Sequence, residues 1–186
     1  KILLTFFSPS GYEIRKNYPQ ADCVSYLPLD TAGNARTFVK LVEPEFAIFV
    51  KYEVWHNIFN ELKKAKVKHY IISAIYRENQ VYFRGYGSWF RETLRNTSQI
   101  FTQDQRSVNL LKKIDLTNVI HAGDTRFDRV FEISQKSEKL PKAEYFSQGK
   151  FTLIAGSTWP ADEKILSQVM KEFPDMKLII APHQVD

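Results

Sequence analysis

The stretch of sequence that decides the fold is Phe46-Ala47-Ile48-Phe49-Val50-Lys51-Tyr52-Glu53-Val54-Trp55-His56-Asn57. Its first five residues are uninterrupted apolar residues, which is typical of a short buried strand. From about Val54 to Ala65 the apolar residues recur at the spacing of one helical face, which predicts a helix. A buried strand that leads directly into an amphipathic helix is the repeating unit of a parallel α/β sheet.

The same alternation extends over all 186 residues. The predicted strands are Ile2–Phe7, Cys23–Tyr26, Phe46–Val50, His69–Ser73, Gln99–Thr102, Asn118–Ala122, Phe151–Ala155 and Lys177–Ala181. Helices are predicted near Pro9, after Asp30, and over Val54–Ala65, Asn79–Arg95, Asp104–Lys113, Arg126–Ser134 and Ala161–Phe173. Because the strand segments are mostly unalternating, we expect them to be buried on both faces of a doubly wound parallel sheet.

Two domains are expected. Residues 1–134 would form a Rossmann-like domain that lacks its first strand and helix, and residues 150–186 would begin a second domain of the same kind. The polar segment 135–149 contains Pro141 and no clear apolar period, so it is interpreted as the linker. The chain starts and stops on predicted buried strands, which favours a piece of a longer protein.

Composition and motifs exclude some function classes. The net charge of +5 favours an anionic partner without choosing among nucleic acid, phosphorylated lipid and nucleotide-sugar. The chain contains neither G-x-G-x-x-G nor G-x-x-x-x-G-K-[ST], which argues against a dinucleotide oxidoreductase and a P-loop nucleotidase. The four histidines have no metal-ligand spacing and the single cysteine does not join them, so neither a metal site nor a cofactor is expected.

Polar residues follow six of the predicted strands. In open parallel sheets ligands bind beyond the carboxyl ends of the strands, so these residues predict one crevice between the two domains. They are Ser8, Ser10, Gly11, Glu53, Ser73, Arg77, Asp124, Thr125, Arg126, Gly156, Ser157, Thr158, Pro182 and His183. The carboxylate of Glu53 has two interpretations: it caps the helix that follows, or it orients a sugar hydroxyl and balances developing charge.

The segment from Arg77 to Arg95 combines basic and aromatic residues. If it is helical, Arg77, Arg84, Arg91 and Arg95 share one face. That face is either simply solvated or a surface for phosphorylated lipid at a membrane. Two glycines, Gly85 and Gly87, weaken the helix.

Seven motifs occur in the order found in one known family. They are Thr5–Glu13 (TFFSPSGYE), Tyr26–Asp30 (YLPLD), Lys51–Asn57 (KYEVWHN), Ile72–Arg77 (ISAIYR), Gly123–Asp128 (GDTRFD), Ala155–Trp159 (AGSTW) and Ala181–His183 (APH). In this respect the chain resembles the 3-deoxy-D-manno-octulosonic acid (Kdo) transferases of Gram-negative bacteria. Each motif alone is weak, whereas the ordered set is specific.

The resemblance implies the two-domain GT-B glycosyltransferase fold and transfer of Kdo from CMP-Kdo to a lipid A precursor, with inversion and without a metal. Glu53 and Arg126 would stabilise the transition state, Arg126 standing where many members have Lys. The nucleotide-sugar would contact Ser157, Thr158, Pro182 and His183, where many members read Pro-Arg in place of the last two. The acceptor side would include Ser8, Ser10, Gly11 and Arg77.

The family pattern also implies that some parts lie elsewhere. The proton-accepting Glu of the family would precede the first strand, and the later CMP-binding motifs would follow Asp186, so this piece is expected not to turn over. The whole protein would act at the cytoplasmic face of the bacterial inner membrane, with no nucleic-acid partner. Two alternatives stay open: another GT-B relative such as a nucleotide-sugar epimerase, and a basic nucleic-acid or membrane-binding module.

Overall fold

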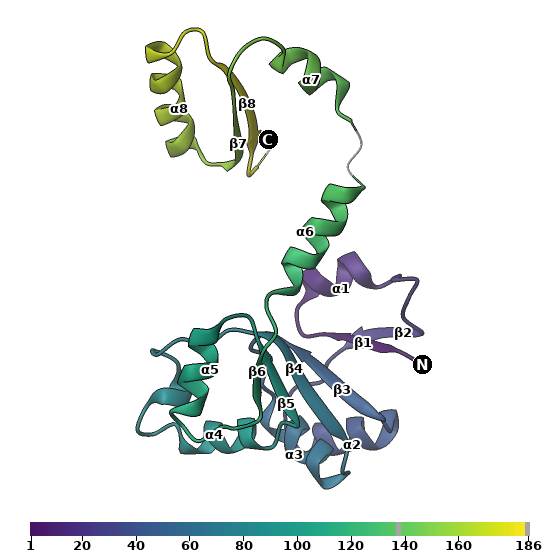
Figure 1. Ribbon diagram of the computed structural model, residues 1–186. Coiled ribbons are helices and arrows are strands. Elements are labelled where there is room, and N and C mark those ends of the chain that lie inside the picture. The colour runs from purple at the N-terminus through teal and green to yellow at the C-terminus, as the bar shows by residue number, and fades with distance from the viewer. Residues whose placement is uncertain (137–138, 185–186) are drawn as a thin grey trace. The chain divides into compact units, whose positions relative to one another are not determined.

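The computed structural model describes residues 1–136 and 139–184, which divide into two compact units, Lys1–Val130 and Phe131–Asp186. The first unit alternates strands and helices along its whole length (Figure 1). Its elements are β1 (Leu3–Phe6), α1 (Pro9–Arg15), β2 (Cys23–Tyr26), α2 (Ala32–Val42), β3 (Phe46–Val50), α3 (His56–Lys64), β4 (Lys68–Ala74), the 3-10 turn η1 (Val81–Phe83), α4 (Ser88–Arg95), β5 (Gln99–Thr102), α5 (Gln105–Lys112) and β6 (Val119–His121). Helix α6 (Thr125–Gln135) begins in this unit and crosses its boundary.

All strand pairs of the first unit are parallel, which confirms the predicted α/β class. Strands β1 and β2 form one sheet, and β3, β4, β5 and β6 form a second in that order. Ile71 of β4 pairs with Ile100 of β5, and Ile100 pairs with Val119 of β6, so these three side chains share one face of the sheet.

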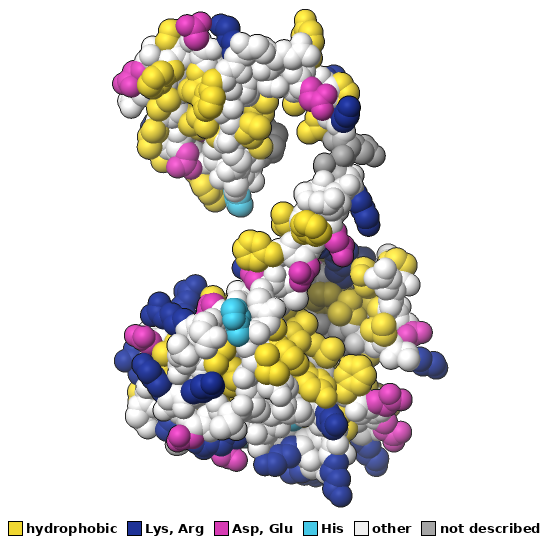
Figure 2. Space-filling view, in the orientation of Figure 1, with side chains coloured by type: hydrophobic (Ala, Val, Ile, Leu, Met, Phe, Trp, Pro, Cys, Tyr) yellow, Lys and Arg dark blue, Asp and Glu magenta, His cyan; other side chains and the backbone are white. Residues whose placement is uncertain are grey.

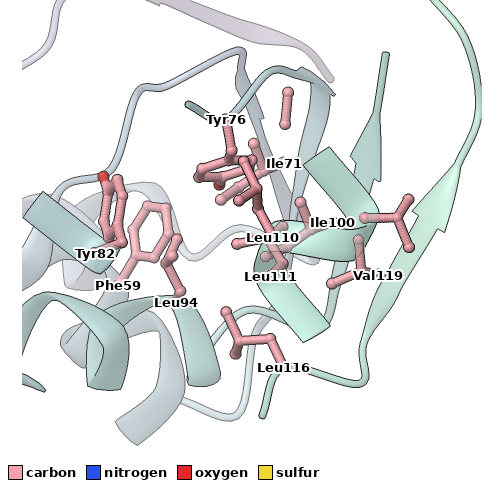
Figure 3. Packing of buried hydrophobic residues seen from close by; sticks show 12 residues of the cluster. Phe59, Ile71, Tyr76, Tyr82, Leu94, Ile100, Leu110, Leu111, Leu116 and Val119 are labelled. Carbon is pink, nitrogen blue, oxygen red and sulfur yellow. The ribbon is translucent and has the colours of Figure 1, made fainter. Parts of the chain in front are cut away.

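That shared face carries the core of the molecule (Figure 3). Ile71, Ile100 and Val119 pack with Phe59 of α3 and Leu111 of α5, and all five are buried. A second, smaller cluster joins α2 to α3 through the buried residues Ala35, Val39, Ile58 and Leu62. Burial of each large aliphatic or aromatic side chain contributes roughly 1.5–3 kcal/mol to folding.

We expected every strand to be buried on both faces, but one face of β3 is exposed. Phe46, Ile48 and Val50 are 56%, 53% and 50% exposed, while Ala47 and Phe49 between them pack against the core. Such alternation arises because α2 and α3 pack on the face of Ala47 and Phe49. Figure 2 shows hydrophobic side chains gathered on the surface of the first unit.

The helix predicted over Asn79–Arg95 is wrong in its first half. Only Ser88–Arg95 is α-helical, after the 3-10 turn η1, so Arg77 and Arg84 do not share a helical face with Arg91 and Arg95. The chain turns at Gly87, where an added Cβ would lie 2.0 Å from the carbonyl oxygen of Val81. The Arg91 guanidinium donates to the carbonyl oxygens of Tyr82 and Arg84, which fixes this turn against α4.

The second unit contains α7 (Pro141–Ser147), β7 (Thr152–Thr158), α8 (Pro160–Glu172) and β8 (Lys177–Pro182). Strands β7 and β8 are parallel, with Leu153 opposite Leu178. The segment expected to be a linker, 135–149, thus holds helix α7, and its residues 137–138 lie outside the described residues, as do 185–186 of the expected second domain. None of the helices in the described ranges is both long and apolar enough to cross a membrane.

Candidate active site at the carboxyl ends of the strands

The carboxyl ends of β3 and β4 adopt an unusual backbone conformation. Lys51 directly after β3 and Ser73 near the end of β4 have φ angles of 64° and 51°, in the left-handed region that non-glycine residues rarely occupy. The two positions are linked, because the Lys51 N–H donates to the carbonyl oxygen of Ile72 at 2.8 Å. Each such residue costs on the order of 1 kcal/mol or more, and this kind of strain concentrates at functional sites.

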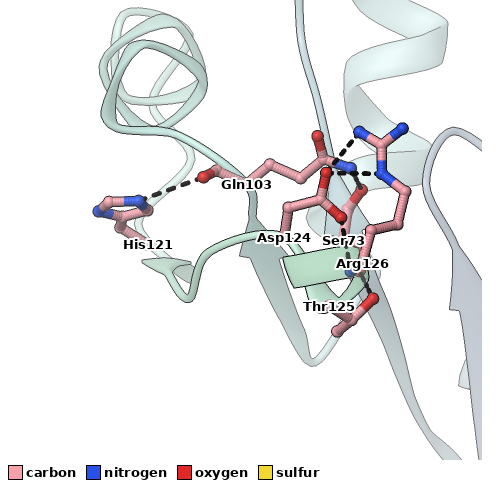
Figure 4. A network of polar contacts seen from close by, with 6 residues as sticks. All are labelled: Ser73, Gln103, His121, Asp124, Thr125 and Arg126. Atoms are coloured by element: carbon pink, nitrogen blue, oxygen red, sulfur yellow. Dashed lines mark hydrogen bonds and ion pairs between the residues drawn. The ribbon is translucent and has the colours of Figure 1, made fainter. Parts of the chain in front are cut away.

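Polar side chains connect the ends of β4, β5 and β6 (Figure 4). The hydroxyl groups of Ser73 and Thr125 are 2.9 Å apart. Gln103 after β5 donates from Nε2 to the Ser73 carbonyl oxygen at 2.9 Å, and its own carbonyl oxygen lies 3.2 Å from His121 Nε2. Three strand ends separated in sequence are therefore held as one polar edge.

Arg126 is oriented by Asp124 at this edge. The Arg126 Nε donates to Asp124 Oδ2 at 2.8 Å, an NH2 group of the same guanidinium donates to the same oxygen, and the Arg126 backbone N–H donates to Asp124 Oδ1 at 3.0 Å. These hydrogen bonds lower the pKa of Asp124, and Lys51 lies close enough to lower that pKa further. Asp124 in turn raises the pKa of Arg126. The exposed Arg126 guanidinium is therefore charged and held in place at this edge of the sheet.

Glu53 does not cap the helix that follows it. Helix α3 begins at His56, with Trp55 as the residue before it, and the N–H groups of its first turn are bound by a different carboxylate, that of Asp30. Among the described residues, the partly buried carboxylate of Glu53 has neither a hydrogen bond nor an ion pair. Of the two interpretations that the sequence allowed, helix capping is excluded, and the carboxylate stays available to a ligand.

The residues expected on the acceptor side lie at the start of α1 and after β4. Ser8 precedes α1, and its hydroxyl is 3.1 Å from that of Ser10. Gly11 has a packing role, because an added Cβ would lie 2.7 Å from the Phe6 ring. Arg77 lies in the segment after β4, where its backbone N–H donates to the Gln80 side chain, and no hydrogen bond or ion pair joins Arg77 to α1 among the described residues.

The second unit brings together the residues expected to bind the nucleotide. Ser157, with φ of 58°, places its hydroxyl 2.9 Å from Nδ1 of His183, which directly follows Pro182 at the end of β8. The His183 ring stacks on Trp159 with ring centroids 4.5 Å apart. Thr158 is buried and donates to Glu163 of α8 at 3.0 Å.

Three residues that take part in these contacts were not singled out by the sequence. Asp30 and Gln103 act through contacts to segments 27 and 30 residues away in the chain, which no local pattern reveals. Lys51 has no sequence signal of its own, since a left-handed backbone at a non-glycine residue leaves no mark in the sequence. A polar residue directly before a predicted helix, as Asp30 is, was the one available signal.

Parallel strands with polar carboxyl ends, repeated in two units, define the class: an α/β protein built of Rossmann-like units, as in the GT-B fold. Solved structures support this fold. The chain aligns with a Listeria monocytogenes structure assigned as a UDP-N-acetylglucosamine 2-epimerase with a TM-score of 0.61 at 11% identity, covering 97% of this chain and 53% of that one. It also aligns with the S. aureus MnaA–UDP co-structure with a TM-score of 0.58 at 14% identity, covering 98% and 54%.

A family model for 3-deoxy-D-manno-octulosonic-acid transferase matches residues 1–129, and the chain belongs to this Kdo transferase family. It is 24% identical over 190 residues to the Kdo transferase of Rickettsia conorii, covering 98% of this chain and 40% of that protein. It is 23% identical over 195 residues to the Kdo transferase of Haemophilus influenzae, covering 97% and 44%. The chain therefore spans less than half the length of these relatives.

Proposed function

We propose that the whole protein transfers Kdo from CMP-Kdo to a lipid A precursor, with inversion and without a metal, at the cytoplasmic face of the inner membrane. The observation that supports this most directly is Glu53: it lies in the sequence range that matches the family, and its partly buried carboxylate makes no hydrogen bond or ion pair with the residues that the structure describes. An oxygen of the lipid acceptor would attack the anomeric carbon while the bond from that carbon to the CMP phosphate breaks. The bonding electrons leave with the phosphate oxygen.

Two kinds of charge develop in this reaction, and the first unit offers a group for each. The sugar ring gains positive, oxocarbenium character, and we assign the stabilisation of that charge to Glu53. The departing phosphate gains negative charge, and we assign the stabilisation of that charge to Arg126, which Asp124 orients. The proton of the acceptor hydroxyl would go to a carboxylate that the family resemblance places outside these residues.

Binding roles follow from the remaining residues. We assign CMP to the cluster of Ser157, Thr158, Pro182 and His183, where the Trp159–His183 pair presents a flat aromatic surface and the Ser157 hydroxyl a polar group. We assign the acceptor to Ser8, Ser10, Gly11 and Arg77. Because CMP, the Kdo carboxylate and lipid A phosphates are all anionic, the net charge of +5 favours each of them.

The test is an assay of the purified whole protein with CMP-Kdo and a lipid A precursor, in which released CMP and the Kdo-lipid are both measured. Glu53→Gln keeps the size of the side chain and removes its charge, so we expect kcat to fall on the order of 100-fold, as for other lost transition-state contacts. Glu45→Gln is the matched control, since this exposed carboxylate lies at the other end of β3. Near-normal activity of Glu53→Gln would contradict the role assigned to Glu53.

Two other results would contradict the proposed function and favour a different one. Tight binding of UDP but not of CMP, with no product lipid, would favour a nucleotide-sugar epimerase, the kind of enzyme to which the fold is similar. Binding of oligonucleotides that weakens steeply with salt, again with no product, would favour a nucleic-acid-binding module.

A further inference from the structure

The turn that carries Glu53 has few restraints of its own. Within Lys51–Trp55 the backbone makes two local hydrogen bonds, from Glu53 N–H to the Val50 carbonyl oxygen at 3.4 Å and from Val54 N–H to that of Tyr52 at 2.9 Å. Its upstream end is fixed by the bond from Lys51 N–H to Ile72. Val54 and Trp55 also pack against the core, and the position of Glu53 depends further on what fixes the downstream end, where α3 begins.

Asp30 fixes that downstream end with three hydrogen bonds. Its carboxylate accepts from the backbone N–H groups of Asn57 and Ile58 at 3.1 and 3.0 Å, one on each oxygen. Its carbonyl oxygen accepts from the Asn57 side chain at 2.6 Å. The first turn of an isolated helix leaves such N–H groups without partners, and a carboxylate also gains from the helix dipole there.

Other contacts show that this junction joins two parts of the unit. Asp30 follows β2 and precedes α2, whose apolar side packs on α3 through Ala35, Val39 and Ile58. On the other side of the turn, the rings of Phe7 and Trp55 have centroids 4.7 Å apart, which ties the turn to the end of β1 next to Ser8. The Glu53 turn thus lies between segments from β1, β2 and β4.

We propose that Asp30 is a positioning residue, which holds the start of α3 and thereby sets the place of the Glu53 carboxylate. This inference rests on the proposed function for its catalytic consequence, but its geometric part stands without it. An uncapped helix start shifts or frays, and a displacement of about 1 Å in a catalytic group is enough to cost on the order of 100-fold in rate. In the described part of the chain, the side-chain hydrogen bonds of Asp30 go to the backbone of Asn57 and Ile58, so Asp30 need not touch the substrate to act.

The experiment compares Asp30→Ala with Asp104→Ala in the whole protein. Asp104 is the matched control, since its carboxylate caps α5 through Ser107 N–H at 2.6 Å, and each substitution therefore removes one aspartate that caps one helix of the same unit. We expect Asp30→Ala to lower kcat on the order of 10- to 100-fold with KM for CMP-Kdo changed less than about threefold. Asp104→Ala should leave kcat within about threefold although it also lowers the melting temperature.

A conservative variant separates positioning from simple stability. Asp30→Asn keeps one acceptor oxygen and can still cap, so its kcat should lie between those of wild type and Asp30→Ala. Equal kcat values for Asp30→Ala and Asp104→Ala would overturn the proposal. So would a loss of activity in Asp30→Ala that merely follows the unfolded fraction at the assay temperature.

Hydrogen exchange of the same proteins tests the geometric part without any turnover. Peptides that cover residues 52–58 should exchange faster in Asp30→Ala and unchanged in Asp104→Ala. If the wild-type protein transfers no Kdo, the proposed function fails. Hydrogen exchange then still tests whether Asp30 holds the start of α3 in place. Unchanged exchange over residues 52–58 in Asp30→Ala would then exclude the positioning role.

Discussion

At the scale of single residues, the ion pair of Asp124 and Arg126 gives a pH-dependent prediction. The hydrogen bonds from Arg126 lower the folded-state pKa of Asp124 below its unfolded value of about 3.9, so the pair stabilises the fold above that pH. This stabilisation is lost as the pH falls through the lowered folded-state pKa. We therefore expect Asp124→Asn to lower the melting temperature at pH 7, and the difference from wild type to shrink as the pH falls below about 4.

Asp128→Asn is the matched control, because Asp128 lies in the first turn of the same helix without an ion pair among the described residues. Thermal unfolding of both variants and wild type from pH 7 to about 2.5 makes the comparison. A difference for Asp124→Asn that stays constant over this range would show that the substitution acts through packing rather than through the charge pair.

The sequence predicted which residues lie at the strand ends, but not how they are held. Ser157, Thr158, Pro182 and His183 do come together, because consecutive parallel strands end at the same edge. The role of Glu53 was undecided, since a carboxylate before a helix is equally suited to capping. Only the contact from Asp30, which lies 27 residues before Asn57, removes that ambiguity.

At the scale of elements, the two glycines between η1 and α4 are a matched pair. A Cβ on Gly87 would meet the Val81 carbonyl oxygen at 2.0 Å, whereas a Cβ on Gly85 would meet nothing within 4 Å. Gly87→Ala should therefore destabilise the fold by about 1–3 kcal/mol, as other overpacked sites do. Gly85→Ala should stay within about 0.5 kcal/mol of wild type.

Urea unfolding of the two alanine variants, followed by circular dichroism, measures this difference directly. If both variants unfold at the same urea concentration as wild type, the chain does not make the tight turn at Gly87 in solution. In that case a continuous helix over Asn79–Arg95 would again be the better description of this segment.

The accuracy of the element predictions depended on how strongly each segment is apolar. Cys23–Tyr26, Phe46–Val50 and Gln99–Thr102 are strands with the predicted bounds, and the clearest of them, Phe46–Val50, is an apolar run between the charged residues Glu45 and Lys51. Helix α7 was not predicted, since its 7 residues are too few to show a helical period in the sequence. The false first half of Asn79–Arg95 has a helical spacing of arginines, which charge pattern alone does not distinguish from a solvated loop.

At the scale of the whole molecule, the two units contribute unequally to stability. All the buried hydrophobic side chains of the described residues belong to the first unit, and Thr158 is the one buried residue of the second. Leu111→Ala should cost about 2–5 kcal/mol of unfolding free energy, because Leu111 is fully buried. Ile154→Ala, at a position 70% exposed in β7, should cost about 0.5 kcal/mol or less.

Chemical denaturation of these two variants of the 186-residue chain tests this division. Equal losses for Leu111→Ala and Ile154→Ala would mean that Ile154 is covered in solution. The assignment of residues 1–134 and 150–186 to two domains joined by 135–149 stays a proposal, and the observed boundary at Val130 places α6 partly in each unit.

The stacking of Trp159 on His183 has an optical consequence. The chain has three tryptophans, and the other two are in the first unit: Trp55 contacts Phe7, and Trp89 contacts His56. Trp159 is thus the sole indole of the second unit, with its ring 4.5 Å from the imidazole at the proposed nucleotide site. Its emission colour and lifetime report on that imidazole, so the chain carries a native fluorophore at the place where a nucleotide would arrive.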